Sequence, residues 1–216
     1  MRYYPVNLNL EGKRCIVVGG GPVAERRVLG LIECRASVTV ISPKLTHRLR
    51  ELSDSGTIRH IERPYRSGDL KGAYLVLAST NKHRINRKIG EEARAFGILA
   101  NIATAPSLSD FTLPSVIRRG DFMVTLSTGG KSPALSRRLR IELEGIFGEE
   151  YGVFTEILWA IRERFRKHPP KERKRIYVEL AMSTIPRLLR EKRLGDAEME
   201  LKRITGLGFN EIGFQP

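Results

Sequence analysis

The sequence predicts a doubly wound α/β fold built on a parallel sheet, and three observations lead to it. Short apolar runs alternate with helix-like segments from Lys13 to about Asn101. The apolar runs are rich in Val, Ile and Leu without strict alternation, which is typical of parallel strands covered on both faces. A glycine-rich turn joins the first apolar run to the first helix-like segment, as a βαβ unit requires. With 216 residues, the chain is long enough for a sizeable core.

The elements of this sheet follow in order along the chain. Strands are expected at Arg14–Val18, Ser37–Ile41, Thr57–Ile61, Tyr74–Ala78 and Ile98–Ile102, and helices at Val23–Cys34, Leu45–Ser53 and His83–Phe96. Gly56 and Gly97 mark the exits of two helices. Right-handed crossovers should connect the strands.

The pattern changes near residue 110. Two strand-like runs, Asp110–Ile117 and Phe122–Ser127, flank a turn, and Pro114 predicts that the first run is an edge strand or is interrupted. Helices are expected from Pro133 to about Phe147 and then at Tyr151–Lys167, Lys171–Leu194 with a break at Pro186, and Asp196–Ile204. We therefore expect an α/β domain over residues 1–112, a hairpin-plus-helix segment over 113–148 and a helical domain over 149–216.

Composition and charge limit the possible functions. The formal net charge is +14, which attracts polyanions such as nucleic acid or a small ligand with many carboxylates, or merely keeps the surface soluble. Few aromatics lie among the basic residues, and no helix-turn-helix or zinc pattern occurs, so we expect no nucleic-acid partner. There is no apolar run of about 20 residues and no secretory h-region, so we expect no membrane association. Cys15 and Cys34 are expected to be core thiols of a cytoplasmic protein, and the four His lack metal-ligand spacing.

The glycine turn reads Val-Val-Gly-Gly-Gly-Pro-Val-Ala over residues 17–24. Gly19 permits the tight turn, Gly21 lets the backbone approach a pyrophosphate, and Ala24 takes the close-packing position. Free N–H groups and the positive end of the helix dipole would face the negative charge of the ligand. The turn therefore predicts a Rossmann-type site for a dinucleotide such as NAD, against the alternative of a plain structural turn.

The ribose-binding position departs from the usual dinucleotide fingerprint. That fingerprint has an acidic residue about 20 positions beyond the glycines, which holds the ribose hydroxyls. Here the second strand ends in Ile41-Ser42-Pro43-Lys44, without an acid. Ser42 can replace one hydrogen bond, and Lys44 can favour a 2′-phosphate, so NADP stays open beside NAD.

The ends of the fourth and fifth strands should border the same crevice, because ligands bind beyond the carboxyl ends of parallel strands. Ser79, Thr80 and Asn81 suit contact with a ribose or nicotinamide, and Thr80 or Asn81 can also cap the next helix. The loop that starts at Asn101 contains one carboxylate, Asp110, for which a turn or capping role is the favoured reading.

A second glycine turn, Thr128-Gly129-Gly130-Lys131-Ser132-Pro133, precedes the helix of the third segment. Ser132 is a natural N-cap, and Pro133 fits the first helical position. Gly129 and Gly130 free the backbone for close approach, and Lys131 adds a cation that is continued along the helix by Arg137, Arg138 and Arg140. This pattern suits a carboxylate or phosphate clamp, and equally a well-capped helix with a basic face.

Together these motifs resemble one family. The residues that carry the resemblance are Tyr4-Pro5-Val6 with Leu8 and Leu10, the first glycine turn, Asn101 to Pro106, Phe111 to Pro114, and Ser127 to Pro133. Over about residues 3–145 the sequence is similar to precorrin-2 dehydrogenase, which is also the dehydrogenase/ferrochelatase portion of siroheme synthase. The helical remainder resembles the small C-terminal domain of that family.

The resemblance implies NAD-dependent oxidation of precorrin-2 to sirohydrochlorin in siroheme biosynthesis. It also implies a homodimer formed through the hairpin and the following helix, and some members insert ferrous iron as well. Pro22 and Val23 would contact the dinucleotide at the glycine turn, and Pro43 and Lys44 would do so at its adenosine end. The substrate carries eight carboxylates, which suits a basic chain. The residues expected to bind it are Asn101, Thr128, Gly129, Lys131, Ser132 and Arg138.

One position departs from the family in a way that bears on chemistry. Family members commonly carry an Asp in the loop before Pro106, and Thr104 stands at the matching position. A threonine hydroxyl is a poor general base near pH 7, and metal insertion requires removal of pyrrole N–H protons. We therefore expect a dehydrogenase with weak or no chelatase activity, with Thr104 and Asp110 as its candidate catalytic residues. The alternatives are a bifunctional enzyme and a non-catalytic module that binds NAD(H) or a tetrapyrrole.

Overall fold

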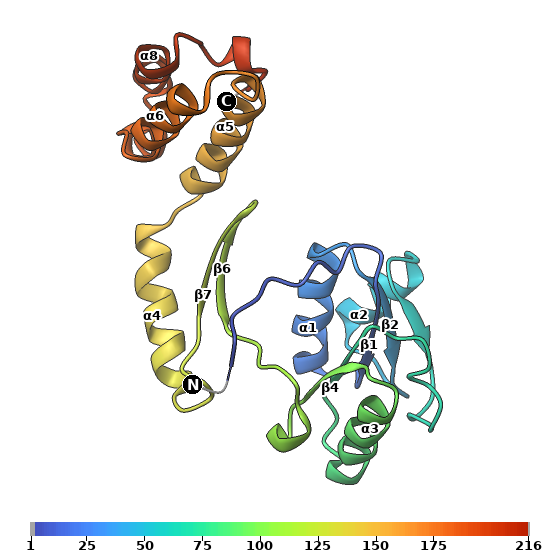
Figure 1. The fold of residues 1–216 in the computed structure, drawn as a ribbon. Coiled ribbons are helices and arrows are strands. Elements are labelled where there is room, and N and C mark those ends of the chain that lie inside the picture. The colour runs from blue at the N-terminus through green and yellow to red at the C-terminus, as the bar shows by residue number, and fades with distance from the viewer. Residues whose placement is uncertain (1–2, 216) are drawn as a thin grey trace. The chain divides into compact units, whose positions relative to one another are not determined.

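The computed structural model describes residues 3–215, and the chain forms two compact units that meet between Leu113 and Pro114 (Figure 1). The first unit contains a five-stranded sheet, and the second contains a two-stranded hairpin and the remaining helices. Each unit has its own buried apolar cluster or clusters, which is expected of a separately packed domain.

The sheet of the first unit is parallel throughout, with strand order β3-β2-β1-β4-β5. Its strands are β1 (Arg14–Val18), β2 (Ser37–Ile41), β3 (Arg59–Ile61), β4 (Leu75–Ala78) and β5 (Leu99–Ile102). The predicted doubly wound parallel sheet is therefore confirmed. The direction of winding reverses between β1 and β4, and folds of this class bind their ligands beyond the carboxyl ends of the strands at such a switch point.

Helices cover both faces of this sheet (Figure 1). On one face, α1 (Pro22–Glu33) and α2 (His47–Asp54) pack on Cys15 and Val17 of β1. On the other, α3 (His83–Ala95) packs on a cluster that includes Ile16 and Val18. The consecutive residues Cys15 to Val18 of β1 thus alternate between the two faces and are all buried, which explains why this strand reads as a continuous apolar run.

The second unit begins with an antiparallel hairpin of β6 (Ser115–Arg119) and β7 (Phe122–Leu126). Then follow α4 (Pro133–Ile146), α5 (Glu150–Arg164), α6 (Pro170–Ala181), α7 (Ile185–Arg190) and α8 (Leu194–Thr205). The last four helices enclose an apolar core that includes Ile157, Ile161 and Leu180. Phe122, Phe147 and Tyr151 stack with ring centroids 5.1–5.4 Å apart and join the hairpin to the start of α5.

Three local predictions differ from the structure in where an element begins, breaks or is capped. The run Asp110–Ile117 is extended strand only from Ser115, because the backbone N–H of Asp110 bonds the carbonyl of Ala100 and Pro114 follows. The break expected at Pro186 in the helical run Lys171–Leu194 is present but begins a few residues earlier, since α6 ends at Ala181 and Pro186 lies in the first turn of α7. The N-cap of α3 is Lys82, whereas Thr80 or Asn81 was expected.

Candidate functional site

The glycine turn after β1 adopts the conformation that the sequence predicts. Gly19 has φ +121°, and a Cβ there would lie 2.7 Å from the carbonyl oxygen of Ser79, so only glycine fits. A Cβ on Gly20 would overlap the carbonyl oxygen of Lys44. By contrast, the space around Gly21 is open to 4 Å. The first two glycines thus let neighbouring loops close in, and the third leaves room for a ligand.

The N-terminus of α1 is free to take an anion. Gly21 is its N-cap and offers no side chain to accept from the N–H groups of the first turn. Pro22 and Val23 are exposed there, and Val23 has 43% of its surface accessible. Open space, unused N–H donors and the positive end of a helix dipole together suit a dinucleotide diphosphate.

The loop after β2 is held by its own serine. The Ser42 hydroxyl donates to the carbonyl of Lys44 at 2.7 Å, and Ser42 is buried. His60 bonds the Ser42 carbonyl at 2.8 Å. The Ser42 hydroxyl proton is therefore used in a hydrogen bond within the loop. Toward a ribose, the Ser42 hydroxyl could act only as a hydrogen-bond acceptor. Pro43 and Lys44 are exposed at the end of this strand.

Arg27 of α1, which we did not single out from the sequence, joins the ends of β4 and β5. Its guanidinium donates to the carbonyl of Ala78 at 3.2 Å, to the Ser79 hydroxyl at 2.9 Å and to Asn101 Oδ1 at 2.9 Å. All three acceptors are neutral. Burial, followed by the like charge of Arg26, lowers the pKa of Arg27 from its ordinary value. Arg27 therefore places a partly buried positive charge beside two residues predicted to contact ligand.

Asn86 of α3 is a second residue that the sequence reading missed. Its side chain is fully buried and bonds both Thr80 and Thr104. Both Asn86 and Arg27 lie on the apolar stripes of their helices, beside Ile89 and Val28 respectively. A polar residue on a buried stripe is the sequence signal that would have found them.

The candidate carboxylate, Asp110, is anchored to the sheet. Its Oδ2 accepts from the backbone N–H of Ala100 at 2.9 Å, and its own N–H donates to the Ala100 carbonyl at 2.9 Å. Asn101 Nδ2 donates to the carbonyl of Phe111 at 2.9 Å and holds the same loop. These bonds correspond to the turn role that the sequence favoured.

The second glycine turn is in the second unit and caps α4 as predicted. Ser132 Oγ accepts from the N–H of Leu135 at 3.3 Å, and Thr128 Oγ1 accepts from the N–H of Ser132 at 3.0 Å. Gly129 and Gly130 both have positive φ. Arg138 is bonded to Glu142 at 2.8 Å, which raises the pKa of the arginine. Lys131, exposed beside the cap, is the cation of the turn best placed to meet an anion.

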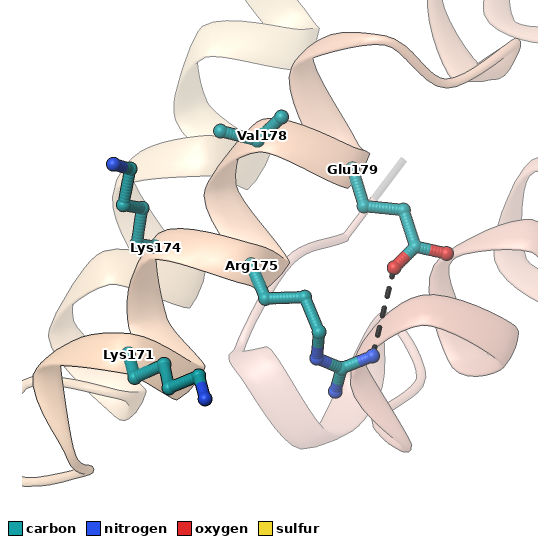
Figure 2. Close-up of a pocket in the computed structure, with 5 residues that line it drawn as sticks. All are labelled: Lys171, Lys174, Arg175, Val178 and Glu179. Carbon is teal, nitrogen blue, oxygen red and sulfur yellow. Dashed lines mark ion pairs between the residues drawn. The ribbon is translucent and has the colours of Figure 1, made fainter.

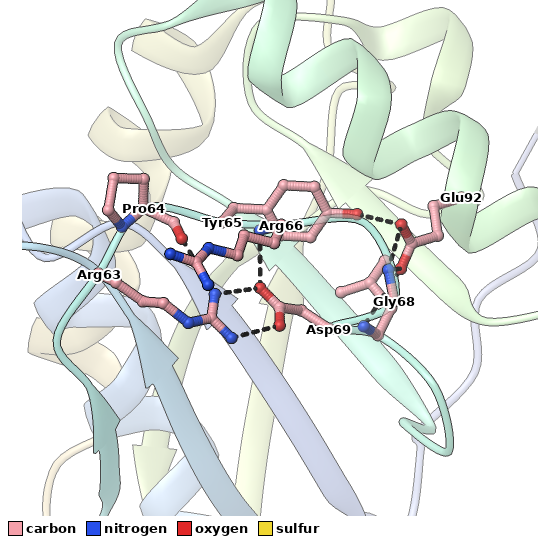
Figure 3. Close-up of polar contacts among 8 residues, drawn as sticks. Arg63, Pro64, Tyr65, Arg66, Gly68, Asp69 and Glu92 are labelled. Atoms are coloured by element: carbon pink, nitrogen blue, oxygen red, sulfur yellow. Dashed lines mark hydrogen bonds and ion pairs between the residues drawn. The ribbon is translucent and has the colours of Figure 1, made fainter.

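Two further clusters lie away from these turns. The loop between β3 and β4 is held by Glu92 of α3, whose carboxylate accepts from the Tyr65 hydroxyl and from backbone N–H groups, and by a bidentate pair of Arg63 with Asp69 (Figure 3). In the second unit, a hollow on α6 is lined by Lys171, Lys174, Arg175, Val178 and Glu179 (Figure 2). No residue predicted to be functional lines that hollow.

Residues 3–215 contain neither a metal-binding cluster of side chains nor a helix able to span a membrane. Within this range, no group of three or more His, Cys, Asp or Glu could hold a metal ion. None of the helices described has the length and apolar character needed to cross a bilayer.

The sheet order and the glycine cradle at its switch point define a dinucleotide-binding protein of the Rossmann class. The family model described as "Putative NAD(P)-binding" matches residues 6–115, about half of the chain. The chain belongs to this family.

Comparisons with individual proteins extend beyond the first unit. The chain is 39% identical to siroheme synthase from Nitrosococcus oceani over 167 residues, which is 77% of the chain and 36% of that protein. It is 33% identical to siroheme synthase from Thioalkalivibrio sulfidiphilus over 217 residues, covering 99% of the chain and 44% of that protein. The chain therefore spans less than half the length of these relatives. The solved structure of "SirC, precorrin-2 dehydrogenase" matches with a TM-score of 0.76 and 25% identity, covering 95% of the chain and all of that protein.

Proposed function

We propose that the chain oxidises precorrin-2 to sirohydrochlorin with NAD. The observation that carries this proposal is the open, uncapped turn at Gly21, set at the switch point of the sheet. The match to a precorrin-2 dehydrogenase along its whole length supports the choice of substrate. The reaction removes one hydride and one proton from precorrin-2; NAD takes up the hydride as NADH, and the proton goes to solvent.

In this proposal, the residues around the glycine turn and the strand ends bind and orient NAD and the substrate, and they take little part in proton transfer. The first-turn N–H groups of α1 would hold the diphosphate, and the ends of β2 and β4 would hold the two nucleoside halves. Arg27 fixes the Ser79 hydroxyl and the Asn101 amide, so the crevice wall is organised before ligand binds. Bound NAD supplies the hydride acceptor, and holding the reacting carbon against it is the main task of the protein.

We propose that iron insertion is weak or absent in this chain. A chelatase must remove pyrrole protons, and the family Asp is replaced by Thr104. Asp110, the other candidate, already accepts a backbone hydrogen bond from β5. Thr104→Asp would place a carboxylate at this position, within reach of the Asn86 amide. Because a carboxylate can take up the pyrrole protons, this variant should gain metal insertion.

A direct experiment separates the two activities. Purified protein is given precorrin-2 with NAD or NADP, and NADH or NADPH formation is followed by absorbance. A second assay gives sirohydrochlorin and ferrous iron to the wild-type chain and to Thr104→Asp. Cofactor reduction with iron insertion at the uncatalysed rate is the expected wild-type result. Rapid iron insertion by the wild-type chain would refute the proposed split, and a bound substrate without cofactor reduction would indicate a binding module.

We propose that the substrate carboxylates are bound by the turn Thr128–Pro133 and Lys131. The turn combines two glycines of positive φ with a capped helix start, so backbone N–H groups and one cation are available together. Lys131→Met should raise the KM for precorrin-2 while leaving the Kd for NAD unchanged. Lys174→Met, on α6, serves as a control with the same loss of charge.

We further propose a homodimer formed by the hairpin and α4. These elements bury little: Ser136 is the one buried residue of α4, whereas Leu135, Ile141 and Ile146 are 46%, 55% and 54% exposed. Several large apolar side chains left exposed on one helix are typical of an interface. Sedimentation analysis should show a dimer that Ile141→Glu dissociates and that Val178→Glu, an equivalent change on α6, leaves intact. A wild-type monomer at all concentrations would contradict the proposal.

We place the enzyme in the cytoplasm. Neither Cys15 nor Cys34 forms a disulfide, which suits a reducing compartment. Burial raises the pKa of Cys15 to about 11, so this thiol is protonated and unreactive at neutral pH. Fractionation of the source cells with an antibody to the chain would test the assignment.

A further inference from the structure

A buried amide links the loops that follow β4 and β5. Asn86 is fully buried on α3, and its Nδ2 donates to the carbonyl of Thr80 at 2.8 Å and to Thr104 Oγ1 at 2.9 Å. Its Oδ1 accepts from the Thr80 hydroxyl at 2.7 Å. The three hydrogen bonds satisfy the amide on both sides, as burial of a polar group requires.

The orientation of this amide is determined by its partners. A backbone carbonyl can only accept a hydrogen bond, so the atom of Asn86 that faces the Thr80 carbonyl is the NH₂ group. The same NH₂ group therefore faces Thr104. Turning the amide over would set two acceptor oxygens against each other at 2.8 Å.

This orientation assigns a role to the Thr104 hydroxyl. Since Asn86 Nδ2 is a donor, the oxygen of Thr104 acts as the acceptor in their bond. The hydroxyl hydrogen of Thr104 is then left to donate to a different group. Thr104 is exposed, directly beyond the end of β5, where a ligand of this fold would lie.

We infer that Asn86 is a positioning residue that presents the Thr104 hydroxyl to bound ligand as a hydrogen-bond donor. The ligand atom is an acceptor oxygen, supplied either by the nicotinamide carboxamide or by a substrate carboxylate. The inference rests on the proposed dehydrogenase function and deepens it. It gives Thr104 a role in binding as a hydrogen-bond donor, which a general base, as a proton acceptor, could not fill. The loops after β4 and β5 are held in one arrangement by the same amide.

Three variants test the inference. Thr104→Val keeps the shape of the side chain and removes the donor, whereas Thr104→Ser keeps the donor. Asn86→Asp replaces the NH₂ group by an oxygen that would accept the Thr104 hydrogen and turn it inward. Thr57→Val, at an exposed position before β3, is a control for the same change of residue type.

For each variant, the Kd for NAD is measured by calorimetry, and KM and kcat for precorrin-2 are measured in steady state. Thr104→Val and Asn86→Asp should raise either the Kd for NAD or the KM for precorrin-2 roughly three- to tenfold, which corresponds to the loss of one hydrogen bond. A higher Kd for NAD identifies the carboxamide as the acceptor, and a higher KM alone identifies a substrate carboxylate. Thr57→Val should stay within about twofold of wild type, and Thr104→Ser, which keeps the donor, should recover most of the affinity that Thr104→Val loses.

Two outcomes keep the inference separate from the proposed function. If wild type reduces NAD and Thr104→Val matches it in both constants, the inference is overturned and the dehydrogenase stands. If wild type shows no turnover, the proposed function fails, and calorimetric titrations of Thr104→Val and Thr104→Ser with NAD and with precorrin-2 decide the role of the hydroxyl: wild-type Kd values for both ligands in Thr104→Val would overturn the inference. Because Thr104 is exposed, its variants should fold even if Asn86→Asp does not, which thermal denaturation would show.

Discussion

Replacing Gly21 by alanine should weaken NAD binding without disturbing the fold. Its φ of −89° and ψ of −176° are open to alanine, and a Cβ would meet nothing within 4 Å. Alanine is a poorer N-cap than glycine by a few tenths to about 1 kcal/mol, but it also restricts the unfolded chain by a similar amount. The free energy of unfolding should therefore change by less than about 1 kcal/mol.

The effect on the cofactor should be larger. The added methyl group projects into the space that a diphosphate would occupy at the start of α1. Overpacking by one methyl group costs about 1–3 kcal/mol, which corresponds to roughly 5- to 150-fold weaker binding. Calorimetric titration with NAD measures this change, and urea denaturation confirms the fold.

Two further glycine variants are controls for the effects of Gly21→Ala on NAD affinity and on stability. Gly30→Ala, in the same helix with nothing within 4 Å of its Cβ, should leave NAD affinity unchanged and stabilise the helix slightly. Gly20→Ala should destabilise the protein itself, because its Cβ overlaps the carbonyl of Lys44. A folded Gly21→Ala protein with wild-type affinity for NAD would refute the placement of the diphosphate.

Three other changes have definite expected results. Arg27→Met should raise the Kd for NAD roughly three- to tenfold, because the ends of β4 and β5 lose their shared donor, and calorimetry measures this. Glu92→Ala should lower the free energy of unfolding by about 2–4 kcal/mol, since three donors in the loop after β3 lose their acceptor; a change under about 0.5 kcal/mol in urea denaturation would contradict this. The Arg63 guanidinium lowers the pKa of Asp69 below its unfolded value, so the pair stabilises the fold above the unfolded pKa and is lost as pH falls through the folded pKa. Urea denaturation of Asp69→Asn should accordingly show a weaker loss of stability between neutral pH and pH values below about 4 than wild type shows.

The central sheet could be predicted from sequence because its signals are local. β1 and β2 begin and end at the predicted residues, since nearly all of their buried positions on both faces are apolar, with Thr39 the exception. The glycine turn could also be predicted from sequence, because Gly19 has a φ that no other residue adopts easily. The start of the hairpin was harder to predict. The sequence around Asp110 has a strand-like pattern, but in the folded chain Asp110 bonds Ala100 of β5, which the local pattern does not indicate.

The site was predicted only in part, for a related reason. Strand-end residues such as Ser79 could be identified from topology alone. Arg27 and Asn86 could not, because what a helix side chain touches depends on how the helix packs on the sheet. The Ser42 hydroxyl shows the converse: its position was foreseen, but its bond to Lys44 was not. Long-range hydrogen bonds of this kind carry no periodic signature in sequence.

The most direct test of the central claim is the stoichiometry of hydride transfer. Purified protein is incubated anaerobically with precorrin-2 and excess NAD, and NADH and sirohydrochlorin are quantified from the same reaction. The proposed dehydrogenase function predicts one NADH for each sirohydrochlorin formed, and Gly21→Ala should form both products more slowly than the wild-type chain at NAD concentrations below the raised Kd of the variant. Sirohydrochlorin formed no faster than without protein, while NAD and precorrin-2 are both bound, would contradict it.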